Sequence, residues 1–256
     1  MNWSRNGRLL ELELDRPPCN EIGSVALEEL ERFLPELEDA GALLVHSSVE
    51  AGFCAGADLR ELYTRGRELE EAKRLDAVRD FLTRIHAVLD RIDAAPIPTV
   101  AAVHGVVFGG GLELALCCDL VVADRTARFA FPELRLGLVP GFGGIPRLRR
   151  DVSNSLVRDL LFTGRSLGAA RAHAAGLVSQ LTAPGRALEG ARAASAQALK
   201  FDPAAIAAAK RFLKPLPRED CHGEIEIFLD LFRRPVVQDA LRRFAEHDTG
   251  PLPYLP

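Results

Sequence analysis

The first fifty residues combine two hydrophobic periodicities. Residues 8–14 alternate apolar and charged side chains, which predicts a half-buried strand. Residues 42–47 are almost continuously apolar, as in a strand buried within a parallel sheet. Residues 24–39 between them predict an amphipathic helix, with apolar side chains near helical spacing at Val25, Leu27, Leu30, Phe33, Leu34 and Leu37. The order strand, helix, strand predicts a right-handed crossover.

Strand and helix patterns continue to alternate through the first 150 residues, and the remainder is almost entirely helical. Further strands are predicted at 99–103, 120–123 and 128–131. Helices are predicted at 59–63, 75–93, 153–163, 168–174, 186–199, 203–212, 218–232 and 236–245. The polar segment 64–70 is expected to be mobile. The pattern indicates an α/β fold without an internal repeat or a flexible linker.

The stretch 99–123 has the most distinctive pattern in the chain. It begins as a strand, turns through Gly105 and the triple glycine 109–111, and continues as an apolar helix interrupted by Glu113. A glycine-rich turn before a helix presents free backbone N–H groups and the positive end of the helix dipole. The turn therefore suits a developing negative charge. A membrane span is not expected here, because the stretch also contains His104 and Asp119.

Composition narrows the class of protein. The chain has 256 residues, and a net charge of -4 argues against a dedicated nucleic-acid-binding protein. The charged N-terminal segment lacks the apolar core of a signal peptide. The five cysteines are odd in number and show no C-x-x-C spacing, which indicates reduced thiols and a cytoplasmic location.

Two carboxylates and two small-residue loops are the candidates for chemistry. Glu113 is surrounded by apolar residues, and a buried carboxylate is costly unless it is paired or used. Glu133 follows Phe-Pro and, taken alone, is typical of an ordinary helix start. The loops 53–57 and 107–111 each follow a predicted strand, and the carboxyl ends of parallel strands are where ligands bind. One N–H from each loop could hold one oxyanion.

Other common sites are absent from the sequence. The glycines fit neither GxGxxG nor a Walker A loop, and no serine lies in G-x-S-x-G. The histidines are scattered, and Cys221 and His222 are adjacent rather than spaced as metal ligands. The sequence therefore predicts no metal and no nucleotide cofactor.

Five segments, taken together and in this order, resemble the enoyl-CoA hydratase/isomerase (crotonase) superfamily over nearly the whole chain. They are FCAGADL at 53–59, AVHG at 102–105 continuing to GGGLELALCCD at 109–119, FAFPELRLGLVPGFGG at 129–144, LFTG at 161–164 and AAGLV at 174–178. The resemblance implies a spiral of ββα/βαβ repeats over residues 1–185. It also implies a helical trimerisation region over 186–256 that covers the active site, in a homotrimer or a dimer of trimers.

The resemblance further implies an acyl-CoA thioester as the substrate, with no additional cofactor. The N–H groups of Ala57 and Gly110 would form the oxyanion hole, and Gly141 would help to orient the carboxylates. Members with glutamates matching both Glu113 and Glu133 are hydratases, in which one carboxylate deprotonates water and the other passes a proton to C2. The substrate-binding positions implied are Ala55, Asp58, Leu59, Arg60, Phe131 and Phe142.

Departures from the family pattern leave the acyl group open. Phe131 stands where short-chain hydratases are often polar, and Ile145 and Pro146 replace a common Thr-Gln. Residues 244–250 lack a lysine that often contacts the CoA phosphates, so Arg60 is the best basic candidate for that contact. The alternatives are an enoyl-CoA isomerase, a hydratase or dehydratase for branched, cyclic or carrier-bound acyl groups, and a non-catalytic acyl-CoA-binding module.

Overall fold

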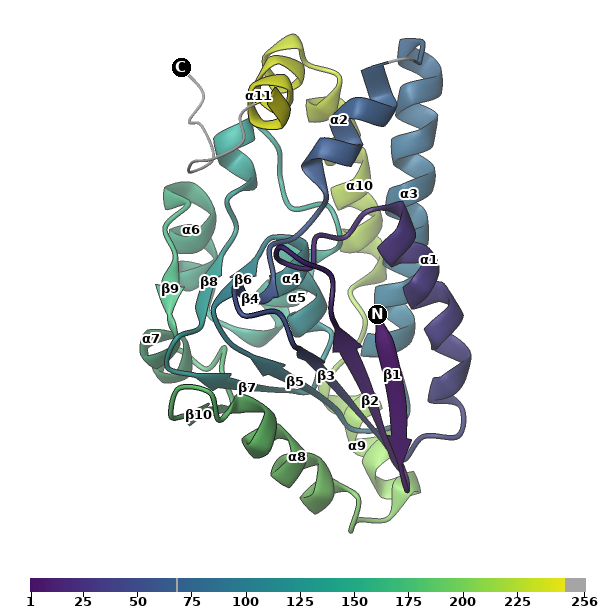
Figure 1. The fold of residues 1–256 in the computed structure, drawn as a ribbon, viewed down its shortest axis with the longest axis vertical. Coiled ribbons are helices and arrows are strands. Elements are labelled where there is room, and N and C mark those ends of the chain that lie inside the picture. Colours follow the sequence, from purple (N-terminus) through teal and green to yellow (C-terminus); the bar gives the residue numbers. More distant parts are fainter. Residues whose placement is uncertain (68, 247–256) are drawn as a thin grey trace.

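The computed structural model describes residues 1–67 and 69–246 (Figure 1). Its larger sheet has the strand order β1-β2-β3-β5-β7-β10. These strands are β1 (Asn2–Asn6), β2 (Leu9–Leu14), β3 (Ala42–Ser47), β5 (Thr99–Val103), β7 (Leu120–Asp124) and β10 (Gln180–Thr182). β1 and β2 form an antiparallel hairpin, whereas the other neighbouring strands are parallel. The strands expected at 8–14, 42–47, 99–103 and 120–123 are confirmed to within a residue.

A smaller sheet adjoins the first and has the order β4-β6-β8-β9. Its strands are β4 (Gly52–Cys54), β6 (Val106–Phe108), β8 (Arg128–Ala130) and β9 (Leu167–Gly168). β4 and β6 lie within segments expected to be loops, and that expectation is wrong. Each is only three residues long; β4 begins at Gly52 and β6 lies between Gly105 and Gly109, so neither shows a recognisable alternation.

Helices fill the intervals between the strands. They are α1 (Ser24–Phe33), α2 (Leu59–Arg67), α3 (Glu71–Asp93), α4 (Gly110–Leu116), α5 (Gly144–Asp151), α6 (Asn154–Thr163), α7 (Ala169–Ala174), α8 (Ala187–Ala198), α9 (Pro203–Leu213), α10 (Arg218–Phe232) and α11 (Pro235–Glu246). Short 3-10 helices are η1 (Leu34–Leu37) and η2 (Glu133–Leu136).

Four helices differ from those expected, and the simplest case is α3, which begins at Glu71, four residues before the expected start at 75. α1 ends at Phe33 and tightens into η1 at Pro35, and Val25 faces solvent instead of the core. α2 extends through residues 64–67, which the sequence analysis expects to be mobile; residue 68 lies outside the described residues. α5 was not expected, because glycines precede it and Pro146 lies in its first turn.

Both faces of the larger sheet are covered. In β3, Leu43 and Val45 point into the main core, whereas Leu44 points into a second core between the sheet and α8. The prediction that strand 8–14 is exposed on one face is therefore wrong, because α8 covers Glu11 on that face. Arg192 of α8 donates hydrogen bonds of 3.0 and 2.7 Å to the Glu11 carboxylate. Figure 1 shows α8 running below the sheet.

The C-terminal helices return to the first half of the chain. α10 packs against α3 and α5, and α11 packs against α2, at the top of the view in Figure 1. The α/β class with a helical C-terminal region is thus confirmed. The region expected over 186–256 includes residues 247–256, which lie outside the described residues.

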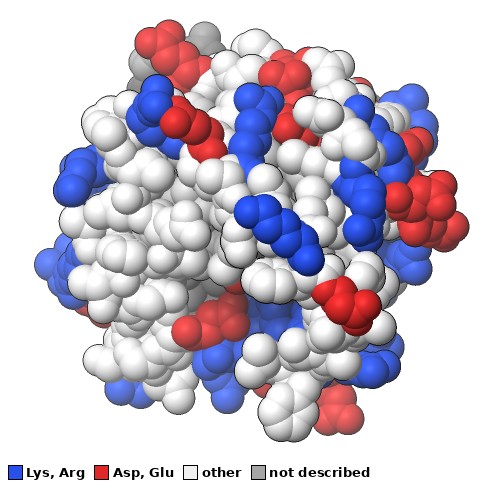
Figure 2. Space-filling view, turned by 90° about the horizontal axis from the view of Figure 1, so that it is seen from below, with Lys and Arg blue, Asp and Glu red and all other residues white. Residues whose placement is uncertain are grey.

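The charge distribution agrees with the low net charge. Seen from below, Lys and Arg side chains are interspersed with Asp and Glu, and the left half of this face is mostly uncharged (Figure 2). Within residues 1–67 and 69–246, no helix has the length and apolar character needed to cross a membrane.

Candidate active site

The two small-residue loops emerge side by side at the carboxyl ends of β4 and β6. These strands pair in parallel, with Gly52 opposite Val106. A Cβ placed on Gly110 would lie 3.4 Å from the Ala57 nitrogen, and both residues line the same cavity. Gly110 is the first residue of α4, so its N–H has no partner within the helix. The structure therefore brings together the two N–H groups expected for one oxyanion.

Gly109 connects this loop to Glu133. Its backbone angles, φ 47° and ψ -123°, are accessible to glycine and strained for other residues. A Cβ at this position would also lie 2.3 Å from Oε1 of Glu133. Glycine is therefore required at this position, because the Glu133 carboxyl group lies directly against the backbone of the loop.

Glu113 lies in the first turn of α4 and is 1% exposed. Its Oε1 atom accepts hydrogen bonds of 2.8 Å from the N–H groups of both Phe142 and Gly144. Burial nevertheless raises the pKa of Glu113 to about 7, against the opposing effect of these two N–H groups and of Arg147. The carboxylate can therefore exchange a proton near neutral pH.

Glu133 begins η2 directly after Pro132, so the helix start expected there is confirmed as a 3-10 turn. Its Oε2 atom is buried and has no hydrogen-bond partner among the described residues. Burial, and then the charge of Glu113, raise the pKa of Glu133 well above its ordinary value. The two carboxyl groups line one cavity but differ in their surroundings. The N–H groups of Phe142 and Gly144 stabilise the charged form of Glu113, whereas burial favours the neutral form of Glu133.

The N–H donors to Glu113 come from Phe142 and Gly144, one and three positions after Gly141, the position expected from the resemblance. Gly141 instead contributes its carbonyl oxygen, which accepts a hydrogen bond of 2.8 Å from Nε2 of His86 in α3. Burial lowers the pKa of His86 to about 4, so the ring is neutral at physiological pH. Gly141 thus fixes the segment that carries the donors.

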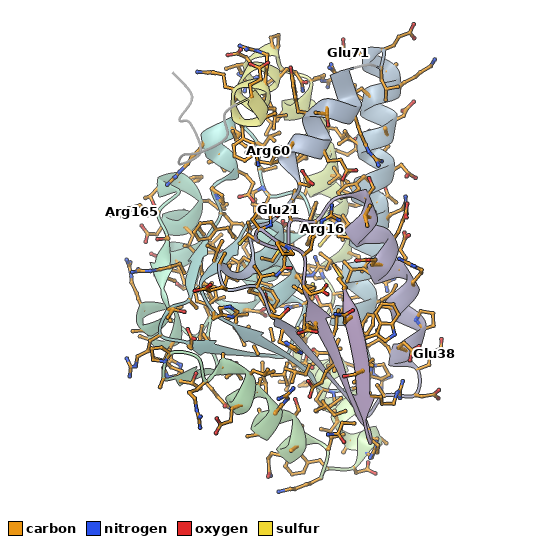
Figure 3. All side chains as sticks on the ribbon, in the orientation of Figure 1. Arg16, Glu21, Glu38, Arg60, Glu71 and Arg165 are labelled. Atoms are coloured by element: carbon orange, nitrogen blue, oxygen red, sulfur yellow. The ribbon has the colours of Figure 1, made fainter. Side chains whose placement is uncertain are left out.

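The cavity has a volume of about 480 Å³. Its apolar wall is formed by Val78, Phe81, Leu82, Leu136, Leu138, Phe142 and Phe228. Within the part of the chain that the structure describes, its lining also includes Arg60, Arg65, Arg74 and Arg84. The Arg60 guanidinium lies 5.4 Å from the centre of the Phe244 ring of α11. Figure 3 labels Arg60 and Glu21, two lining residues from different parts of the chain, above the larger sheet.

The expected substrate-binding residues divide into two groups. Ala55, Asp58, Leu59, Arg60 and Phe142 line the cavity. Phe131 is not among the lining residues, and the expectation that it contacts the ligand is corrected here. Its ring is 0% exposed, and its Cζ atom would lie 2.9 Å from a Cβ on Gly144. Phe131 therefore lies in the core beside Gly144, the residue whose N–H binds Glu113.

Sequence reasoning missed two residues that hold the Phe142–Gly144 backbone. Glu224 in α10 is 4% exposed and accepts hydrogen bonds from the N–H groups of Gly143 (2.7 Å) and Ile145 (3.1 Å). Arg147 is 0% exposed and donates to the carbonyl oxygen of Phe142 at 3.0 Å. For Glu224 a signal existed: it interrupts the apolar stripe of Cys221, Ile225 and Phe228, much as Glu113 interrupts its own helix.

Within residues 1–67 and 69–246, no group of three or more His, Cys, Asp or Glu side chains is arranged to hold a metal ion. The arrangement that is present combines an oxyanion site, two inequivalent carboxyl groups and an apolar cavity with a partly basic lining. It can polarise a carbonyl group and move protons beside it.

Comparison with known proteins identifies relatives of this chain. The family model for enoyl-CoA hydratase/isomerase matches residues 4–251. A Rhizobium meliloti protein named "Probable enoyl-CoA hydratase" is 35% identical over 245 residues, which cover 93% of this chain and 91% of that protein. The human "Enoyl-CoA hydratase domain-containing protein 2, mitochondrial" is 38% identical, over 77% of this chain and 68% of the relative.

The solved structures agree on the fold. The crystal structure of an enoyl-CoA hydratase from Bacillus halodurans has a TM-score of 0.83 and covers 94% of this chain and 98% of that chain. The sequence identity is 23%, so this likeness supports the fold alone.

Proposed function

The chain belongs to the enoyl-CoA hydratase/isomerase family, and from this premise we propose that it is an enoyl-CoA hydratase. The reaction is the reversible syn addition of water across C2=C3 of a 2-enoyl-CoA thioester. One observation carries the proposal: Glu113 and Glu133 line the same cavity beside the N–H groups of Ala57 and Gly110, and they have unequal hydrogen bonding. In the family pattern, isomerases usually keep only the second of the two carboxylates.

The thioester oxygen would accept hydrogen bonds from Ala57 and Gly110. These donors hold the charge that develops on the oxygen when C3 is attacked, and one such donor contributes about 3–4 kcal/mol to transition-state stabilisation. The small residues 55–57 and 109–111 let the thioester approach the backbone closely.

The proton steps follow from the different surroundings of the carboxyl groups. Glu113, whose charge is stabilised by Phe142 and Gly144, takes a proton from water while the water oxygen bonds to C3. The C2=C3 electron pair moves toward the thioester, and the enolate collapses as Glu133 gives its proton to C2. A proton then returns from Glu113 to Glu133 through water, and the net change is the addition of one H₂O.

The test is hydration of crotonyl-CoA and of longer, branched and cyclic 2-enoyl-CoAs, followed as loss of absorbance of the conjugated thioester. Turnover of at least one of them, absent in Glu113→Gln, supports the proposal. Turnover of a 3-enoyl-CoA without any hydration would show an isomerase instead. Binding of acyl-CoA without turnover of either kind would leave a binding module.

The finer parts of the proposal concern the acyl group, the assembly and the location. The apolar cavity wall favours an acyl chain longer than crotonyl. Exposed apolar side chains, including Phe162 (74%), Phe212 (87%) and Leu213 (75%), support burial in a homotrimer or a dimer of trimers. Light scattering of the purified protein tests the assembly. We propose a cytoplasmic location and no cofactor, since the CoA thioester is the substrate.

A further inference from the structure

The Phe142–Ile145 segment is held by two buried carboxyl groups that bind alternate N–H groups. Glu113 accepts from Phe142 and Gly144, and Glu224 accepts from Gly143 and Ile145. The segment leads into the first turn of α5, where N–H groups have no partner within the helix. The four donors are thus divided between α4, which carries Glu113, and α10, which carries Glu224.

Glu224 uses both of its oxygens for this contact. Oε1 accepts from Gly143 at 2.7 Å, and Oε2 accepts from Ile145 at 3.1 Å. No cation forms an ion pair with Glu224 among the described residues, although the charge of Arg147 acts on it from nearby. A carboxyl group that is only 4% exposed and has no such pair lowers the stability of the fold. This cost suggests that Glu224 has a functional role.

Two carbonyl groups of the same segment are held by Arg147. Nη1 of Arg147 donates to the carbonyl oxygens of Phe142 at 3.0 Å and Gly143 at 3.2 Å, while its Nε donates to Asp93 at 2.9 Å. Arg147 therefore restrains the carbonyl groups but leaves the N–H groups of Gly143 and Ile145 without a partner. Glu224 is the acceptor for these two N–H groups, so it holds the Phe142–Gly143 and Gly144–Ile145 peptide planes from their N–H side.

We propose that Glu224 is a positioning residue for Glu113: by holding Gly143 and Ile145 from α10, it aims the Phe142 and Gly144 N–H groups at Oε1 of Glu113. This inference rests on the proposed function for its effect on rate. It makes the C-terminal helical region part of the acid–base machinery, because a side chain of α10 sets the donors of a carboxylate on α4.

The variant Glu224→Gln keeps the size of the side chain but presents an NH₂ group to one of the two N–H donors. Glu226→Gln is the matched control, because Glu226 lies two residues further along α10, is exposed and pairs with Arg79 on the surface. We expect Glu224→Gln to lower kcat at least tenfold and to change KM for acyl-CoA less than threefold. Glu226→Gln should match the wild type. Loss of binding in parallel with kcat would overturn the inference.

A double-mutant cycle separates positioning from general damage to the fold. If Glu224 acts through Glu113, Glu224→Gln should have no further effect on the residual rate of Glu113→Gln. A further tenfold loss in that background would show an effect that does not pass through Glu113, and the inference would fail.

Amide hydrogen exchange tests the geometry without relying on activity. In Glu224→Gln, the amides of residues 142–145 should exchange at least tenfold faster, while Glu226→Gln leaves them unchanged. If the wild type hydrates no enoyl-CoA, the proposed function fails and this exchange experiment still decides the contact. Unchanged exchange in Glu224→Gln would refute the positioning role whatever the activity.

Discussion

The backbone N–H of Gly144 donates a 2.8 Å hydrogen bond to Oε1 of Glu113, and a Cβ on Gly144 would lie 2.7 Å from that same oxygen. The contact therefore requires both the backbone N–H and a glycine, because any Cβ would clash with the Glu113 carboxylate. It links the glycine-rich segment before α5 to the first turn of α4, although 31 positions separate the two residues in sequence.

Gly144→Ala should lower kcat for hydration at least tenfold. The added methyl group meets Cγ and Oε1 of Glu113 and the ring of Phe131, all of them packed in the core, and overpacking of this kind costs about 1–3 kcal/mol. Steady-state kinetics and urea unfolding measure both effects. The control is Gly223→Ala, at an exposed helical position where a Cβ would meet nothing within 4 Å. Full activity of Gly144→Ala would contradict this account of Glu113.

Glu113→Gln and Glu133→Gln should each reduce kcat by about 10²–10⁴-fold, with KM much less affected, because each removes one proton-transfer group. The double variant should be little worse than either single variant, since the two groups serve one reaction. Kinetics on the best enoyl-CoA substrate provide the measurement. If Glu133→Gln kept near-normal kcat, Glu133 would have no role as the acid.

Stability should depend on pH through Glu113. Its pKa is raised from 4.5 to about 7 on folding, so its contribution to stability is fully present below pH 4.5 and is lost as the pH rises through 7. Glu113→Gln has no carboxyl group to titrate and should not lose this stability. The free energy of unfolding of Glu113→Gln, relative to the wild type, should therefore rise by at most about 2–3 kcal/mol between pH 5 and pH 8. Urea unfolding of both proteins at several pH values tests this. A constant difference would show that the carboxyl group titrates near its ordinary pKa.

Arg147→Met should destabilise the fold by about 3–5 kcal/mol, because it leaves buried partners of a charged group without their donor. Arg147 is 0% exposed and binds Asp93, Asp90 and two backbone carbonyl groups. Chemical unfolding gives the magnitude. Arg149→Met is the comparison, since Arg149 is exposed and lies 3.7 Å from Asp220, and it should change stability by less than about 0.5 kcal/mol.

Arg60→Ala should raise KM for acyl-CoA by roughly fivefold, equivalent to about 1 kcal/mol, while kcat stays near normal. Arg60, in α2, lines the cavity beside Phe244 of α11, and we expect a CoA phosphate to reach it there. The increase should shrink at high salt, because the contact is partly exposed to solvent. Arg165→Ala, on the surface away from the cavity (Figure 3), should leave KM unchanged. An unchanged KM for Arg60→Ala would remove Arg60 from the phosphate site.

The sequence by itself determined the long elements. The buried strand 42–47, the helix 218–232 and the glycine turn leading to Glu113 were predictable, because apolar periodicity and glycine act locally. It also singled out Glu113, since a carboxylate inside an apolar helix is anomalous wherever that helix packs. The three-residue strands β4 and β6 were not predictable, because their stability comes from pairing with each other across the sheet.

Only the tertiary structure decided what surrounds Glu113. Its donors proved to be Phe142 and Gly144 instead of Gly141, and Phe131 proved to be a core residue, because the direction of an N–H or a ring depends on the turn before α5. That turn is held by Glu224, 111 positions after Glu113 in sequence. No local pattern specifies a contact over such a separation, because it forms only when α10 packs against α5.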